Sequence, residues 1–177
     1  MSWIQTYTGK KFDLFRCVAE DVCIEDIAHA LSMQCRFVGH CKKFYSVAEH
    51  SVWVSRLCQP ENAMWGLLHD AAEAYLGDVS RPLKQNETMI AYRNAEAKVM
   101  ELVCRRFGLF LEEPKDVKLA DSSMLAFEAR NLFRTPPVDD WDRQYPILSD
   151  NQRVEGWLPG DAEVWFIDRY YEIKKGS

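Results

Sequence analysis

The sequence predicts an all-α fold, an irregular bundle of five or six helices that forms a single domain over residues 1–177. Apolar residues recur at helical spacing in several segments, and residues typical of helix starts and stops separate these segments. No strand pattern is convincing beyond the N-terminal end of the chain. The chain has 177 residues, of which 47% are hydrophobic, which is enough for one packed core and short for two.

A short β-hairpin is expected first, over residues 3–14, because β-favouring residues alternate around Thr8 and Gly9. Helices are expected to follow over residues 24–35, 46–58, 60–77, 87–107, 114–127 and 162–173. Ser46 precedes Glu49 by three positions, the spacing of a capping box at a helix start. Gly77 and Gly108 are suitable helix stops.

The segment 135–159 contains four prolines and little periodicity, so it should form a long surface loop. The net charge of -5 argues against binding to a nucleic acid polymer, which requires clustered Lys and Arg. The N-terminus lacks the pattern of a signal peptide, and no apolar run approaches the roughly 18 residues of a membrane span. We therefore expect a cytoplasmic protein that does not associate with membranes.

The most informative stretch is residues 68–78, where one predicted helix and its exit carry a His and three carboxylates. His69 and Asp70 are adjacent and project about 100° apart on a helix, so both could reach one ion between them. Glu73 lies on the same face one turn later, beside such an ion without needing to be a ligand. Apolar neighbours direct these polar groups toward a buried cleft. A solvated surface pair is the alternative interpretation of this stretch alone.

Two further residues complete a pattern of potential metal ligands: His50 lies on the preceding predicted helix and Asp121 on a later one. A His, an adjacent His-Asp pair and a distant Asp, each on a helix, resemble the HD-domain phosphohydrolase superfamily. Residues 46–51, 69–73 and 77–78, with Pro82 and Lys84, resemble its 5′-deoxynucleotidase branch. They are also similar to related phage and prophage proteins, some of which are dATP triphosphohydrolases.

The resemblance implies that a divalent metal ion is bound by His50, His69, Asp70 and Asp121. Zn, Co, Mn and Mg are the candidate metals, and imidazole with carboxylate also suits Fe. By the same resemblance, two acidic residues act in catalysis. Glu73 orients or deprotonates the attacking water, and Asp78 helps to protonate the leaving group.

The substrate side of the implied site begins with Arg36 and Phe37, where the deoxynucleotidase branch has an Arg followed by an aromatic residue, usually Trp. Arg36 would grip phosphate and Phe37 would pack against sugar or base. Pro82 and Lys84 complete the implied substrate contacts, and Arg81 adds positive charge. A second basic group comprises His40, Lys42 and Lys43. These side chains could reach a polyphosphate tail or be solvated, and solvation is the favoured interpretation.

The resemblance implies a metal-dependent phosphohydrolase that cleaves deoxynucleotides such as dATP or dAMP at the α phosphate and releases a deoxynucleoside. It also suggests a homo-oligomer. Ala74 follows Glu73, whereas the branch that hydrolyses guanosine tetraphosphate has an acidic residue there, which counts against that substrate. Two alternatives stay open: an HD-fold phosphoesterase acting on another phosphoester, such as a cyclic nucleotide, and a non-catalytic helical sensing module.

Overall fold

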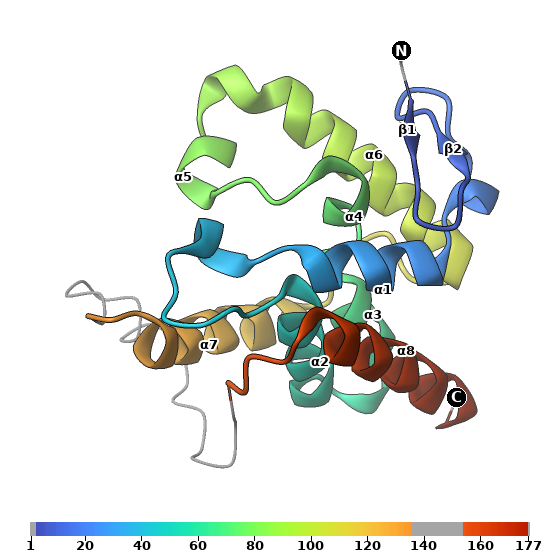
Figure 1. Ribbon diagram of the computed structural model, residues 1–177. Coiled ribbons are helices and arrows are strands. Elements are labelled where there is room, and N and C mark those ends of the chain that lie inside the picture. Colours follow the sequence, from blue (N-terminus) through green and yellow to red (C-terminus); the bar gives the residue numbers. More distant parts are fainter. Residues whose placement is uncertain (1–2, 136–153, 177) are drawn as a thin grey trace.

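A computed structural model describes residues 3–135 and 154–176, and over these residues the protein is mostly helical with a short antiparallel hairpin near the N-terminus (Figure 1). This architecture confirms the all-α fold class expected from the sequence. Within the same residues, no helix combines the length and apolarity needed to cross a bilayer.

The elements follow one another along the chain as two strands and then helices. They are β1 (Ile4–Gln5), β2 (Lys11–Phe12), α1 (Ile24–Met33), α2 (Val47–Leu57), α3 (Ala63–Leu68), α4 (Glu73–Leu76), α5 (Arg81–Lys84), α6 (Ile90–Phe107), α7 (Lys115–Leu132) and α8 (Pro159–Gly176). Short 3₁₀ turns lie at Ala19–Asp21, Arg36–Gly39, Pro60–Asn62 and Glu87–Met89.

The hairpin predicted over residues 3–14 is present. Ile4 pairs with Phe12, and Gln5 pairs with Lys11. Gly9 has a φ of +84°, a left-handed conformation that glycine adopts without steric cost. The Phe12 ring is buried and stacks on Tyr75 with ring centroids 4.1 Å apart, so the hairpin is attached to the helical core.

Helix α2 is the central element because it packs against α1, α3, α7 and α8. Figure 1 shows α1 crossing the middle of the molecule, with α5 and α6 on one side and α2, α3, α7 and α8 on the other. The core between these elements is aliphatic and aromatic, with buried side chains such as Ile27, Leu31, Val47, Leu68 and Phe166. The contacts of α2 with both α3 and α7 bring residues from three distant parts of the sequence to one place.

The structure corrects the prediction of one continuous helix over residues 60–77. Helix α3 ends at Leu68 and α4 begins at Glu73. Between them the amides of Ala71, Glu73 and Ala74 donate to the carbonyl three residues earlier, instead of four. This tighter winding is that of a 3₁₀ turn, which is often found at functional positions inside helices. It carries His69 and Asp70.

Other helix boundaries differ less. The helix expected over residues 87–107 starts with a 3₁₀ turn and continues as α6, which Gly108 ends with a φ of +70°. The four-residue helix α5 was not predicted, and the last helix begins at Pro159 and extends to Gly176. Residues 154–158 contain no regular element, in agreement with the predicted loop over 135–159, but residues 136–153 lie outside the described part of the chain.

The capping box predicted at the start of α2 is only half formed. The Ser46 side chain accepts a hydrogen bond from the Glu49 amide at 3.0 Å, as expected. The Glu49 carboxylate instead accepts three backbone N–H groups at 2.7–3.0 Å, those of Glu155, Gly156 and Trp157. A buried carboxylate needs such partners, and this one joins α2 to the segment that leads into α8.

Close packing of α3 on α2 gives a stability prediction at Gly66. A Cβ atom there would lie 2.6 Å from Cys58 Sγ and 3.1 Å from the Ser55 Cα. We expect Gly66→Ala to lower the free energy of unfolding by about 1–3 kcal/mol, as overpacking usually does. Urea denaturation would measure this, with Gly160→Ala in α8 as the control because a Cβ there meets nothing within 4 Å. Equal stability of the two variants would contradict the prediction.

Candidate metal centre

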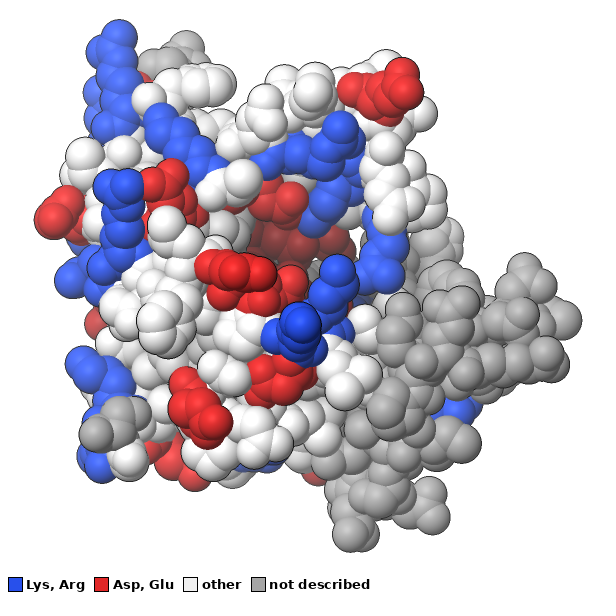
Figure 2. All heavy atoms as spheres, turned by 180° about the vertical axis from the view of Figure 1, so that it is seen from behind, with Lys and Arg blue, Asp and Glu red and all other residues white. Residues whose placement is uncertain are grey.

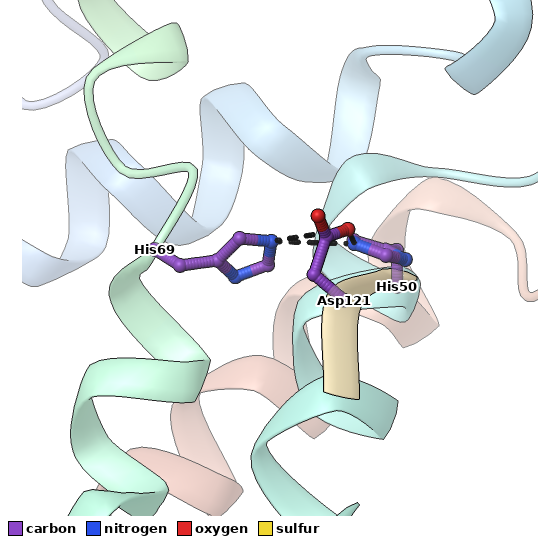
Figure 3. Close-up of side chains that lie close together, drawn as sticks. All are labelled: His50, His69 and Asp121. Atoms are coloured by element: carbon purple, nitrogen blue, oxygen red, sulfur yellow. Dashed lines mark hydrogen bonds and ion pairs between the residues drawn. The ribbon is translucent and has the colours of Figure 1, made fainter. Parts of the chain in front are cut away.

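Three of the predicted metal ligands meet in one cluster. His50 comes from α2, His69 from the turn after α3 and Asp121 from α7, and their side chains point toward one another (Figure 3). His50 Nε2 lies 3.3 Å from His69 Nε2 and 3.2 Å from Asp121 Oδ1. One ligand atom from each residue lies within 4.8 Å of the others, so this cluster could hold a metal ion.

Asp70, the fourth predicted ligand, borders this cluster. Its Oδ2 atom lies 3.2 Å from His69 Nε2 and 4.0 Å from His50 Nε2. Ligand atoms that bind one metal ion at about 2.0–2.2 Å are separated from one another by roughly 3–4 Å. The spacing of these nitrogen and oxygen atoms therefore suits a shared divalent cation.

The hydrogen bonds of the two imidazoles explain why their Nε2 atoms are available as ligands. His69 Nδ1 lies 2.8 Å from the Gly66 carbonyl oxygen, which can only accept, so this nitrogen carries the proton. His50 Nδ1 lies 2.6 Å from a carboxylate oxygen of Glu128 and donates in the same way. In the neutral rings both Nε2 lone pairs then face each other, an arrangement that a cation between them stabilises.

The pKa shifts of His69, Asp70 and Asp121 also indicate that the cluster favours positive charge. Burial alone would lower the pKa of His69, but the carboxylates of Asp70 and Asp121 outweigh it and raise this pKa to about 9. Burial likewise opposes ionisation of the two acids, yet the neighbouring imidazoles lower the pKa of Asp121 to about 2 and that of Asp70 further. The two ionised carboxylates thus stabilise positive charge between them, carried by the Nε2 proton of His69 or by a cation that displaces this proton.

Two arginines lie beside the cluster. Arg36 Nη1 is 3.7 Å from Asp70 Oδ2, and its Nε donates to Glu128 at 3.1 Å. Arg81 Nη2 is 3.9 Å from Asp121 Oδ2, and the Arg81 side chain is 58% exposed. On the face seen in Figure 2, acidic side chains lie deep in a hollow and Lys and Arg side chains gather around it. This charge pattern suits an anionic ligand that reaches the acidic floor through a metal ion.

Glu73 lies outside the three-residue cluster. The side chain is 8% exposed, and burial together with the carboxylates of Asp70 and Asp78 raises its pKa to about 9. Lys84 Nζ lies 3.7 Å from Glu73 Oε1 and donates to Glu96 at 2.6 Å. A buried acid with such a raised pKa beside a candidate metal centre is suited to proton transfer.

Gln34 links the other predicted catalytic acid to Glu73. Its amide donates to the Glu73 carbonyl at 3.0 Å, and its side-chain oxygen accepts the Asp78 amide at 3.1 Å. Asp78 is exposed at the exit of α4, and Pro82 is exposed in the first turn of α5. Both residues are therefore accessible to solvent.

The Arg36–Gly39 turn has a strained backbone. Phe37 and Val38 adopt φ values of +56° and +54°, which are uncommon for residues other than glycine and most costly for a β-branched one. The Phe37 ring packs edge-on against Phe133 at 4.8 Å, and the Arg36 guanidinium lies 5.4 Å from its centre. The turn thus presents an aromatic ring next to a cation.

The second basic group does not act as a unit. His40 and Lys42 are exposed, which agrees with the favoured interpretation that they are solvated. Lys43 is different, because its Nζ donates to the carbonyl oxygens of Val154 and Glu155 at 2.7 and 2.6 Å. This lysine is exposed like the other two, and it also holds the segment before α8.

Glu128 was not identified from the sequence, although it contacts the cluster directly. It is fully buried in α7 and accepts hydrogen bonds from His50, Arg36 and the Tyr45 hydroxyl. Its position seven residues after Asp121 is two helical turns on, and hence on the same face. The seven-residue spacing from Asp121 was the one feature of the sequence that could have indicated Glu128. It identifies Glu128 as a neighbour of the cluster only when α2 is known to lie against this face of α7.

No family model matches the sequence. The chain is 37% identical over 180 residues to the uncharacterized protein YfdR of Escherichia coli K12, an alignment that covers 99% of this chain and 97% of YfdR. It is 34% identical over 188 residues to an uncharacterized protein of Rhodobacter capsulatus, with 97% of this chain and 95% of that protein covered. The chain belongs to the protein family that contains YfdR.

Proposed function

We propose that this protein is a metal-dependent phosphohydrolase of the HD-domain superfamily that acts on deoxynucleotides. The reaction would cleave the bond between the 5′ oxygen and the α phosphorus and release a deoxynucleoside. The observation that carries the proposal is the convergence of His50, His69 and Asp121 from three separate elements, with both Nδ1 atoms engaged so that the Nε2 atoms face one point.

A divalent ion at this centre would lower the pKa of a bound water and neutralise charge on a phosphoryl oxygen. Glu73 is the candidate base that orients or deprotonates the attacking water, since it is buried next to Asp70 without joining the cluster. Positive charge at the centre would favour the ionised form of Glu73 that this role needs. Asp78, which is exposed, would help to protonate the leaving oxygen.

Three basic side chains that lie near the candidate metal centre support an anionic substrate. Arg36 lies within 4 Å of Asp70, and Arg81 lies within 4 Å of Asp121. Lys84 lies within 4 Å of Glu73. A phosphate that meets the metal centre would therefore also meet guanidinium groups, which bind phosphate through paired N–H donors. Arg81 is the more exposed of the two arginines, and we assign it with Lys84 to the outer phosphates of a triphosphate.

A preference for deoxy substrates is expected if Phe37 packs against the sugar. A 2′-hydroxyl placed against this ring would have no hydrogen-bond partner, at a cost of about 1–3 kcal/mol. Rates on dATP should then exceed those on ATP by roughly tenfold to a hundredfold. Hydrolysis of dATP, ATP, dAMP and AMP with added Mn²⁺ or Co²⁺ would measure this, with products separated by chromatography.

The control for this experiment is a matched pair of Phe→Ala variants. Phe37→Ala should reduce the discrimination, whereas Phe15→Ala should not change it because Phe15 is 73% exposed in the segment after the hairpin. Equal rates on ATP and dATP in the wild type would reject the deoxynucleotide assignment. Hydrolysis of cyclic nucleotides alone would favour a phosphoesterase, and no turnover with any metal would reject an enzyme of this kind.

A further inference from the structure

Glu128 is a buried carboxylate of α7 whose three hydrogen-bond donors lie in the turn before α2, immediately ahead of α2 and within α2. Its Oε1 accepts from His50 Nδ1 at 2.6 Å and from the Tyr45 hydroxyl at 2.8 Å, and its Oε2 accepts from Arg36 Nε at 3.1 Å. The side chain is completely excluded from solvent. Because a buried charge without partners is costly, this arrangement defines one position for each of the three donors.

The contact with His50 determines which ring nitrogen faces the cluster. Donation from Nδ1 to Glu128 leaves the Nε2 lone pair directed at His69 and Asp121. The other tautomer would place a proton on Nε2, where a metal ion must bind. The equivalent bond of His69 is made to the backbone carbonyl of Gly66, so it does not depend on a side chain. Glu128 is thus the acidic side chain that controls the ligand state of one imidazole.

The contact with Arg36 extends this control to the neighbouring cation. The guanidinium is 13% exposed and lies between Glu128 at 3.1 Å and Asp70 at 3.7 Å. Its Nε is held by Glu128, so the remaining N–H groups keep a defined direction. Arg36 is also the first residue of the turn in which Phe37 adopts a positive φ. One carboxylate therefore connects His50, a proposed metal ligand, with the guanidinium beside Asp70.

We propose that Glu128 is a positioning residue that holds His50 as an Nε2 metal ligand and Arg36 as a phosphate-directed cation. This inference rests on the proposed metal centre. It assigns to Glu128 no contact with substrate. Tyr45 donates from its hydroxyl to the same carboxylate oxygen, and its backbone carbonyl accepts the Arg36 amide at 2.9 Å, a bond that Tyr45→Phe leaves in place. Its hydroxyl therefore provides a matched control for loss of one hydrogen bond to Glu128.

The test compares Co²⁺ binding by the wild type, Glu128→Gln and Tyr45→Phe, followed by the visible absorption of the bound ion. Glu128→Gln should bind Co²⁺ about 10- to 100-fold more weakly and with shifted absorption bands, as expected when a residue that orients a ligand is lost. Tyr45→Phe should keep the wild-type affinity and spectrum. Circular dichroism and thermal unfolding of each variant would show that the fold is retained.

A second measurement on the wild type does not depend on the folding of any variant. Long-range ¹H–¹⁵N spectra of the Zn²⁺-loaded protein should show the proton of His50 on Nδ1. A proton on Nε2, or an unchanged Co²⁺ affinity and spectrum in Glu128→Gln, would overturn the role of Glu128 while leaving the metal centre intact. Failure of the wild type to bind Co²⁺ or Zn²⁺ would instead overturn the metal centre, and this inference with it.

Discussion

Asp121→Ala is expected to lose the tightly bound divalent ion and, with it, all measurable phosphohydrolase activity. Asp121 contributes the carboxylate oxygen that lies 3.2 Å from His50 Nε2, and it is the acid among the three clustered residues. Loss of a residue that only orients a ligand costs about 10- to 100-fold in metal affinity, so loss of a ligand should cost more than ~100-fold. Elemental analysis after dialysis, together with Co²⁺ titration, would measure the change from about one ion per chain.

The control is Asp168→Ala, which removes an exposed aspartate from α8 and should leave the metal content unchanged. Asp70→Ala tests the fourth ligand separately, because Asp70 borders the three-residue cluster. We expect it to lose the ion as well. Full metal content in Asp70→Ala would restrict the centre to His50, His69 and Asp121, and full content in Asp121→Ala would refute the ligand set.

Glu73→Gln is expected to keep the metal ion but to lose about 10²- to 10⁴-fold in turnover, the usual contribution of a general base. The amide preserves the shape of the side chain but cannot take up a proton. Rates at saturating metal and substrate, with metal content measured on the same samples, would separate loss of the base from loss of the ion. Glu101→Gln is a suitable control, because Glu101 pairs with Arg105 on the partly exposed face of α6.

Glu73→Gln is also expected to change how the stability of the chelator-treated protein depends on pH. The Glu73 carboxyl keeps its proton in the folded state up to about pH 9, since burial and the carboxylates of Asp70 and Asp78 raise its pKa, whereas the unfolded chain ionises it near pH 4.5. Between these values the folded state binds one more proton than the unfolded state, so wild-type stability falls as the pH rises. Glu73→Gln removes this contribution.

The unfolding temperature of Glu73→Gln, relative to the wild type, should therefore increase from about pH 5 to about pH 8. Thermal unfolding of both proteins in the presence of a chelator would measure the difference. Loss of activity combined with a gain in stability is typical of a residue retained for function at a cost to the fold. A difference that does not change with pH, or a turnover loss accompanied by loss of the ion, would contradict the proposed role of Glu73.

The sequence by itself determined the helical architecture, the N-terminal hairpin and the main candidate residues. These features depend on local patterns: the apolar spacing of 24–35, the alternation around Gly9 and the adjacent pair of His69 and Asp70. Such patterns report on residues that are neighbours along one element, and a helix start such as Ser46 is set by a hydrogen bond within one turn.

Only the tertiary structure decided which distant groups meet. Asp121 and Glu128 approach His50 because α7 packs on α2, a contact between residues more than seventy positions apart. The same limit applies to Glu49, whose local pattern indicated a capping box but whose carboxylate binds the amides of residues 155–157. The break between α3 and α4 is likewise absent from the apolar periodicity. The positions of the Asp121, Glu128 and Glu49 carboxylates depend on long-range hydrogen bonds and ionic contacts, which exist only once the helices are packed.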